Sequence, residues 1–278
     1  MKKISRRSFM AAAAVSVAAL AMTACGGSAS SAASSVASSA ASSEDVSSAA
    51  AAELATVEAG KLTMATNATF PPYEMTTDSG EIEGIDVDTA KAIAEKLGLE
   101  LQIDDMEFDA ALLSVQQGKA DIVMAGVTVT DERKAVMDFS DSYATGIQSI
   151  IVPNDSDIAS PDDLAGKKIG TQRGTTGYIY CSDDFGEDSV VAYDSGLTAV
   201  QALNNGQVDA VVIDNAPATE YVAANPGLKV LDTSYAEEDY AIGMAKGSSL
   251  EAAVNAALEE LKADGTLQAI VDKYITAE

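Results

Sequence analysis

The chain has 278 residues, a formal net charge of −26 at pH 7, and neither His nor Trp. Its length suits two modest domains or one large one. The strong acidity argues against nucleic acid as a partner and against docking on an anionic lipid surface. The missing His removes the commonest general base and metal ligand, so we expect no cofactor.

Residues 1–24 have the composition of an export signal. A basic start precedes the apolar segment Met10 to Met22, which is too short to span a bilayer stably. The tripeptide TAC follows and ends in Cys25. This arrangement resembles a bacterial lipoprotein signal peptide, which implies cleavage before Cys25 and a lipid on its thiol. Residues 5–10, SRRSFM, also resemble a twin-arginine signal, so both export routes stay open.

Residues 25–57 are expected to form a flexible tether, because 26–53 are nearly all Ser and Ala. Such a coil reaches roughly 30 Å on average. We expect a lipid-anchored protein on the extracytoplasmic face of the membrane, as on a Gram-positive cell surface. Once Cys25 carries a lipid, Cys181 is the only remaining thiol, so the fold contains no intramolecular disulfide.

From residue 58 onward, short apolar strands alternate with amphipathic helices, which indicates an α/β fold. Strands are predicted at 61–66, 99–103, 122–125, 147–152, 167–170, 190–193, 210–213, 229–231 and 240–244. Helices or helical turns are predicted at 86–97, 108–117, from 130, at 161–165, after 173–177, and at 196–204, 217–225, 248–263 and 267–274. Two prolines make 67–73 a loop.

The stretch 119–140 organises the rest of the chain. A buried strand ends at Gly126, and Thr130 begins a short helix as its N-cap residue. In open α/β sheets, ligands bind at the carboxyl ends of the strands. Arg133 stands beside this edge and offers two parallel donors to a carboxylate. The alternative is an exposed Arg on a short helix.

Residues 116–124 and 204–212 share one pattern: a helix end, Gly, two residues, Asp and a buried strand. This repetition predicts two similar βαβ lobes whose strand ends face one cleft. One lobe brings Arg133, and the other brings Asp214 with the loop at 174–176. The alternative is that the two segments are alike by chance, because many connections from a helix through Gly to a strand have this pattern.

A cation and an anion from opposite lobes suit a zwitterion such as an α-amino acid. Arg133 is expected to hold the carboxylate bidentately, with Thr128 and the backbone N–H groups of Thr175 and Thr176 completing its shell.

Asp214 and the Gly126 carbonyl are expected to receive the ammonium group. Phe70 and Phe108 are candidate walls around the ligand side chain, and plain core packing is the alternative for both.

Several segments together resemble the polar amino acid solute-binding proteins of ABC transporters, over residues 58–275. These are TNATFPPYE (66–74), GIDVD (84–88), GVTVTDER (126–133), DFSD (138–141), GTTG (174–177), VDAVVID (208–214) and KADGT (262–266). The resemblance implies a two-lobe periplasmic-binding-protein fold of type II, with the ligand between lobes of mixed sheet and flanking helices. It also implies a permease partner and a monomer.

In this fold the chain crosses between lobes twice, which we expect near 149–153 and 239–243. Lobe 1 is then 58–150 with 241–278, and lobe 2 is 151–240.

The resemblance also implies site roles. Arg133 and Thr128 hold the carboxylate, with help from Thr176, whereas Asp214 and the Gly126 backbone hold the ammonium. Phe70 packs on the ligand side chain, with Phe108 as a second wall.

Asn67 departs from the family pattern, because many members carry Asp there. That change disfavours a strongly basic ligand. Gln172 and Arg173 lie near the expected side-chain contacts, although an exposed position is the preferred interpretation for Arg173.

Two other functions compete with ligand capture. A dehydratase-like enzyme on the same fold needs a placed acid or base, and no free pair stands out in a chain without His. A sensor head coupled to a receptor would need a membrane-spanning helix after residue 278. We therefore expect a binding protein and not an enzyme.

Overall fold

A computed structural model of the protein describes residues 54–275. The predicted signal peptide (1–24), Cys25 and tether residues 26–53 lie outside the described residues. The residues just before 58 already contact the folded part. Leu54 packs on a core cluster, and the Val57 N–H donates to the Asp121 carboxylate at 2.7 Å. None of the described helices is long and apolar enough to cross a membrane.

The first lobe is built on a five-stranded sheet of order β5-β1-β6-β14-β7. Its strands are β1 (Lys61–Thr66), β5 (Glu100–Asp105), β6 (Ile122–Val123), β7 (Met137–Phe139) and β14 (Gly243–Ala245). Strands β5 and β6 run parallel to β1, whereas β14 is antiparallel to β6 and β7. A small antiparallel sheet joins β2 (Thr69–Phe70), β3 (Glu74–Thr76) and β4 (Ile82–Glu83). The parallel register carries the ends of β1 and β6 to one edge.

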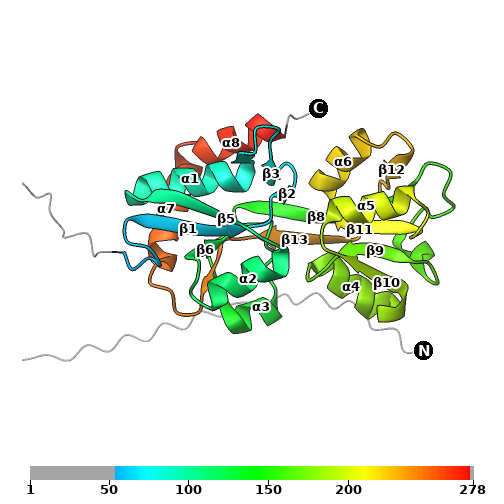
Figure 1. The fold of residues 1–278 in the computed structure, drawn as a ribbon, viewed down its shortest axis with the longest axis horizontal. Helices are drawn as coiled ribbons and strands as arrows, with labels where there is room; N and C mark the ends of the chain where they lie inside the picture. Colours follow the sequence, from blue (N-terminus) through cyan, green and yellow to red (C-terminus); the bar gives the residue numbers. More distant parts are fainter. Residues whose placement is uncertain (1–53, 276–278) are drawn as a thin grey trace, which may run out of the picture. The chain divides into compact units, whose positions relative to one another are not determined.

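Helices cover both faces of this sheet (Figure 1). They are α1 (Ile85–Leu97), α2 (Phe108–Gln116), α3 (Asp131–Val136), α7 (Glu251–Ala263) and α8 (Thr266–Tyr274). Alternation along β1 sends Leu62 and Met64 to the cluster with α1 and α7, and Ala65 to the cluster with α2. This period of two explains why β1 is buried at nearly every position: both of its faces are covered.

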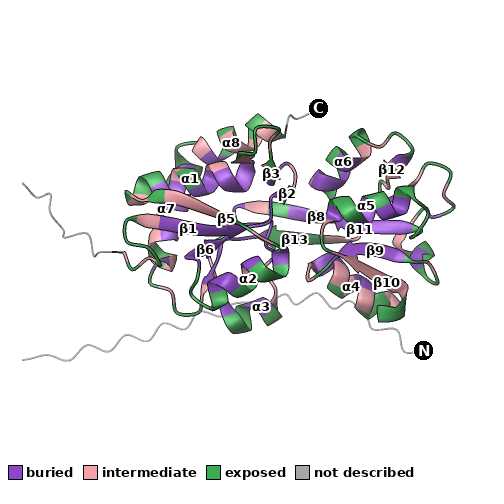
Figure 2. Cartoon of the chain, in the orientation of Figure 1, coloured by how far each residue is buried: buried purple, intermediate pink, exposed green. Residues whose placement is uncertain are grey.

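The second lobe has a sheet of order β10-β9-β11-β8-β12, with β13 also paired to β8. Its strands are β8 (Ala144–Pro153), β9 (Ile169–Gln172), β10 (Val190–Tyr193), β11 (Ala210–Asp214), β12 (Leu228–Val230) and β13 (Ala236–Tyr240). Its helices are α4 (Thr176–Phe185), α5 (Gly196–Asn204), α6 (Asn215–Ala223) and the 3-10 turns η1 (Pro161–Leu164) and η2 (Glu187–Ser189). Figure 2 shows the central strands buried and the outer helix faces exposed.

Two segments carry the chain between the sheets, and they run side by side. The first lies between β7 and β8, and the second between β13 and β14. Tyr143 N–H donates to Tyr240 O, and Ser140 N–H donates to Ile242 O, both at 2.9 Å. The second sheet already includes β8 from Ala144 onward, before the predicted lobe boundary at residue 150. The lobe boundaries themselves stay a prediction.

Most helices and strands predicted from the sequence are present in the structure. The predictions and the structure differ mainly at strands that are polar or very short. The predicted strand 240–244 is wrong, because residues 241 and 242 cross between the sheets and separate β13 from β14. The predicted loop 67–73 contains the two-residue strand β2. Strands β3, β4, β7 and β13 were not predicted; β13 reads AEEDY and has no apolar run. The strand predicted at 122–125 covers only Ile122–Val123.

Candidate functional site

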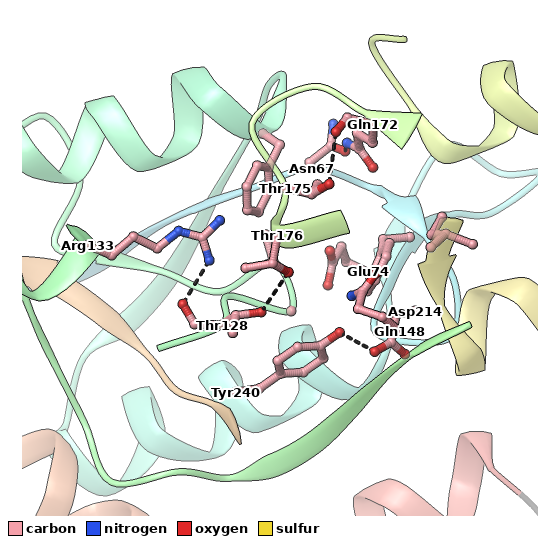
Figure 3. Close-up of a pocket in the computed structure, with 15 residues that line it drawn as sticks. Asn67, Glu74, Thr128, Arg133, Gln148, Gln172, Thr175, Thr176, Asp214 and Tyr240 are labelled. Atoms are coloured by element: carbon pink, nitrogen blue, oxygen red, sulfur yellow. Dashed lines mark hydrogen bonds between the residues drawn. The ribbon is translucent and has the colours of Figure 1, made fainter. Parts of the chain in front are cut away.

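One pocket lies between the two lobes, and residues of both line it (Figure 3). The cavity measures about 30 Å³, which is room for roughly two water molecules. Its lining consists of Asn67, Phe70, Glu74, Phe108, Ala125, Gly126, Thr128, Arg133, Gln148, Gln172, Thr175, Thr176, Ile213, Asp214 and Tyr240. Every ligand-contact residue predicted from the sequence is therefore brought to this one pocket.

Arg133 is buried at the pocket and is not an exposed helix residue. The Thr130 side chain caps α3 and accepts the Arg133 N–H at 3.1 Å, which sets the start of the helix. The guanidinium donates through Nη1 to Thr128 O at 2.7 Å and through Nη2 to Gly174 O at 3.2 Å. It also lies over the Phe108 ring, 5.4 Å from the centroid. These contacts hold the guanidinium between the lobes.

Burial lowers the pKa of Arg133, and the nearby Glu238 carboxylate raises it. A guanidinium stays charged even so. Within residues 54–275, no carboxylate forms an ion pair with it. The pocket therefore contains a buried positive charge whose hydrogen bonds go to carbonyl oxygens, an arrangement that favours an anionic group on the ligand.

Two hydroxyls from opposite lobes meet beside Arg133. Thr128 Oγ1 and Thr176 Oγ1 are 3.4 Å apart, and both donate to Glu238 Oε2, at 3.2 and 3.0 Å. Thr176 is the first residue of α4, so the positive end of that helix also faces this part of the pocket.

Thr175 lines the pocket at the start of α4. As the N-cap of α4 it accepts the Tyr178 N–H at 3.4 Å, and its hydroxyl donates to Gln172 O at 2.8 Å. The Thr175 N–H also points to Gln172 O, at 3.4 Å. Both of its donors therefore have internal acceptors, and the N–H bond is the long one.

Asp214 ends β11 and caps α6, which directs its carboxylate into the pocket. Oδ2 accepts the Tyr240 hydroxyl at 2.6 Å and the Ile147 N–H at 2.8 Å, and Oδ1 accepts the Ala216 N–H at 3.2 Å. Burial raises the pKa of Asp214 to about 6, although these hydrogen bonds act in the opposite direction. The carboxylate is ionised near neutral pH and is available to a cation.

Gly126 requires glycine for two reasons. Its φ is +56°, and a Cβ there would lie 2.8 Å from the Phe70 ring. Its N–H donates to Asp86 Oδ2 at 3.0 Å, and Tyr143 donates to Asp86 Oδ1 at 2.7 Å. Burial raises the pKa of Asp86 to about 6. This buried carboxyl fixes the backbone at Gly126 from behind the pocket.

Glu74 lies beside Asp86 and is fully buried. Burial raises the pKa of Glu74 well above its usual range, and the nearby Asp86 carboxylate raises it further. Both effects favour the uncharged form of Glu74.

Asn67 and Gln172 pair across the lobes at one end of the pocket. Gln172 Nε2 donates to Asn67 Oδ1 at 2.9 Å, and Asn67 Nδ2 donates to Met106 O at 2.9 Å. The neighbouring Arg173 is exposed, with its Nε 3.7 Å from Asp194, as preferred from the sequence. An uncharged amide pair therefore forms this end of the pocket.

Phe70 and Phe108 contribute apolar surface to the pocket. Phe70 is partly buried and stacks on Tyr73 with ring centroids 5.8 Å apart. Phe108 is 6 % exposed and belongs to a core cluster as well as to the lining. Core packing and wall formation thus coexist at Phe108, so the two interpretations of this residue are compatible.

Some lining residues were not predicted from the sequence: Glu74, Ala125, Gln148, Ile213 and Tyr240. Glu74 lies inside the family-like segment 66–74, and Tyr240 lies in the predicted crossing at 239–243. Their places in the sequence could therefore have indicated that both lie near the site. Gln148 interrupts an apolar strand, which is a weak sign of a buried polar role. Glu238, next to the pocket, lies in an unpredicted strand and carried no signal.

Comparisons with known proteins agree on one family. The profile of the bacterial extracellular solute-binding proteins, family 3, matches residues 62–277. The L-cystine-binding protein TcyJ of Escherichia coli (strain K12) is 33% identical over 80% of this chain and 85% of its own.

Two solved structures have the same fold. The arginine-, lysine-, histidine-binding protein ArtJ of Geobacillus stearothermophilus is 36% identical, with a TM-score of 0.75, over 78% of this chain and 96% of its own. An ancestral arginine-binding protein bound to arginine is 43% identical, with a TM-score of 0.74, over 78% and 98%. The two-lobe architecture of the chain is therefore that of type II periplasmic amino-acid-binding proteins.

Proposed function

Because the chain belongs to the bacterial extracellular solute-binding proteins of family 3, we propose that it captures a polar L-amino acid and presents it to the permease of an ABC importer. The observation that carries the proposal is the pocket that combines buried Arg133 with buried Asp214 from the other lobe. An α-amino acid has one charge of each sign, so it matches both residues at once.

Arg133 is the proposed carboxylate clamp. Its planar guanidinium has more donors than its two carbonyl contacts use, and its buried charge forms no ion pair within residues 54–275. Thr128 and Thr176 are the proposed hydroxyl donors, one from each lobe. The backbone at Thr175 and Thr176, at the start of α4, completes the carboxylate shell.

Asp214 and the Gly126 carbonyl are the proposed ammonium site. Asp214 is held by three hydrogen bonds, so its carboxylate needs no rearrangement to meet a cation. The Gly126 backbone is held by Asp86 through its N–H, which leaves the carbonyl for the ligand.

The side-chain end of the pocket favours an uncharged polar amino acid. The amides of Asn67 and Gln172 offer donors and acceptors without charge. Burial raises the pKa of Glu74, which favours its uncharged form. Phe70 and Phe108 would cover the aliphatic part of the side chain. A strongly basic side chain would need an ionised acid at this end, so arginine is the contrasting test ligand.

The pocket residues offer support for binding over catalysis. A catalytic site needs an acid or base poised for proton transfer, whereas the carboxylates of Asp86 and Asp214 are held in hydrogen bonds within the fold. Members of the family are solute-binding transport proteins. We therefore propose no enzymatic activity for this chain.

The N-terminal residues support a proposed location. The basic start, short apolar segment and Cys25 favour a lipid-anchored protein outside the cytoplasm, on a Gram-positive cell surface. We propose separately that the protein acts as a monomer. Mass spectrometry of the exported protein should find a chain that begins at an acylated Cys25. An uncleaved or unmodified Cys25 would contradict the anchor.

Isothermal titration calorimetry against each of the twenty amino acids tests the function. We expect one or a few uncharged polar amino acids to bind most tightly. If arginine binds most tightly, the proposed preference for an uncharged side chain is wrong, whereas the proposed role of Arg133 as the carboxylate clamp is unaffected. Binding to no amino acid would contradict the proposed function.

A further inference from the structure

Glu238 is a buried carboxylate at the junction of the two lobes. It lies on β13, in the strand that leads back to the first lobe, and is 6 % exposed. Its Oε2 accepts hydrogen bonds from Thr128 Oγ1, Thr176 Oγ1 and Gln148 Nε2, at 3.2, 3.0 and 3.0 Å. Its Oε1 is buried without a hydrogen-bond partner among residues 54–275. We call these three hydrogen bonds the Glu238 bridge.

The Glu238 bridge connects the lobes at the place where the ligand carboxylate is expected. Thr128 belongs to the first lobe, whereas Thr176 and Gln148 belong to the second. Glu238 is also the strongest favourable charge acting on Arg133. A carboxylate of the protein itself therefore accepts from the two hydroxyls that the ligand carboxylate would need, near Arg133 but without an ion pair to it.

The two threonine hydroxyls cannot donate to Glu238 and to a ligand carboxylate at the same time. Each threonine hydroxyl has a single proton to donate. While Thr128 and Thr176 donate to Glu238, neither can donate to a second carboxylate. Two carboxylates at one site also repel each other. The bridge and the bound ligand are thus competing states.

We propose that Glu238 substitutes for the ligand carboxylate in the ligand-free protein, holds the lobes together, and must release Thr128 and Thr176 when an amino acid binds. This proposal rests on the proposed function. Glu238 accepts from the two threonine hydroxyls but forms no ion pair with Arg133 and leaves Asp214 without a cation, so it imitates only part of the ligand. We therefore expect it to close part of the ligand-free population, and the amino acid to close the rest.

The proposal predicts that removing the carboxylate tightens binding. A bridged molecule is not competent to bind, and the apparent dissociation constant scales inversely with the competent fraction. If about nine tenths of ligand-free molecules are bridged, Glu238→Ala binds about tenfold tighter. Glu238→Gln keeps the shape and one acceptor without the charge, so we expect an intermediate affinity.

Calorimetry with L-glutamine, L-cystine and L-arginine, each titrated separately, measures this effect in the full-length mature protein. The matched control is Glu237→Ala, which removes the same side chain from the adjacent, exposed position of β13. The control should bind like the wild type. Weaker binding by Glu238→Ala and Glu238→Gln would overturn the proposal, because it would make Glu238 a residue that positions the site.

Small-angle scattering without ligand gives an independent readout. Glu238→Ala should have a larger radius of gyration than the wild type and Glu237→Ala, and saturating ligand should make all three equal. An equal radius in all three ligand-free proteins would contradict the bridge. If no amino acid binds to any of them, the proposed function fails, whereas the ligand-free radii still decide on the bridge. Thermal unfolding shows whether each variant is folded.

Discussion

Arg133 is the proposed carboxylate clamp, and we expect it to contribute more binding energy than any other side chain of the site. Arg133→Ala should weaken amino-acid binding by about 2–5 kcal/mol, because truncating one partner of a desolvated charged pair leaves the other unpaired. Arg133→Lys should also bind poorly, since lysine cannot form the planar fork. Calorimetry measures both. Arg173→Ala is the matched control, because that arginine is exposed; affinities within about threefold of the wild type for the Arg133 variants would exclude the clamp.

Asp214 makes the affinity depend on pH. Its pKa is raised to about 6, so the protonated form gains population as the pH falls through that value. If Asp214 holds the ligand ammonium, affinity should be constant above about pH 7 and fall up to tenfold per pH unit below about 6. Calorimetry between pH 8 and 5 measures the slope.

Two checks separate this slope from other causes. A raised carboxyl pKa stabilises the fold below the unfolded value and loses that stabilisation as the pH rises through about 6, so Asp214 itself does not unfold the protein in this window. Asp86 titrates in the same range behind Gly126. Asp214→Asn should bind weakly with a flat profile; a remaining slope would point to Asp86 instead.

At the scale of elements, the start of α4 must approach α2 closely for the lobes to meet. A Cβ on Gly174 would lie 1.6 Å from Asp109 Oδ1, and the φ of Gly174 is +74°. Gly174→Ala should therefore hinder the approach of the two lobes and weaken ligand binding by about tenfold or more. Calorimetry measures the loss of affinity. The substitution removes no side chain that could contact the ligand, so the loss would come from the hindered approach of the lobes.

The chain offers a matched control for this prediction. Gly206 has a similar φ of +68° in the same lobe, with no atom within 4 Å of the position of a Cβ. Gly206→Ala should show the same backbone destabilisation, about 1 kcal/mol, without a loss of affinity. Asp109→Ala combined with Gly174→Ala should restore binding. An unrescued double variant would show that strain within the loop, and not the contact between lobes, causes the loss.

At the scale of the whole molecule, ligand capture should bring the lobes together. Arg133 and Asp214 belong to different lobes, so one lobe cannot satisfy both charges of an amino acid, and the two crossing segments can absorb the motion as a hinge. A binding amino acid should reduce the radius of gyration in small-angle scattering. Asp214→Ala should weaken both the affinity and the compaction. An unchanged radius, with binding confirmed separately, would indicate a rigid pocket.

The amino-acid sequence by itself determined the local features of this protein. Helix α5 lies at the predicted residues, and Thr130 caps α3 as expected. The strand end at Asp214 was also correctly located, because apolar periodicity and capping residues act over a few neighbouring positions. The strand predicted to end at Gly126 is shorter than expected and ends at Val123. These features were enough to identify the family and to choose residues that all line one pocket.

Only the tertiary structure determined the features that depend on contacts between segments far apart in the chain. Arg133 could equally have been exposed, and only its packing between Phe108 and Gly174 buries it. The polar strand β13 forms because it pairs with β8, and this pairing brings Glu238 to the threonine hydroxyls. Burial and pairing arise from contacts across the whole fold, which no local pattern of residues contains.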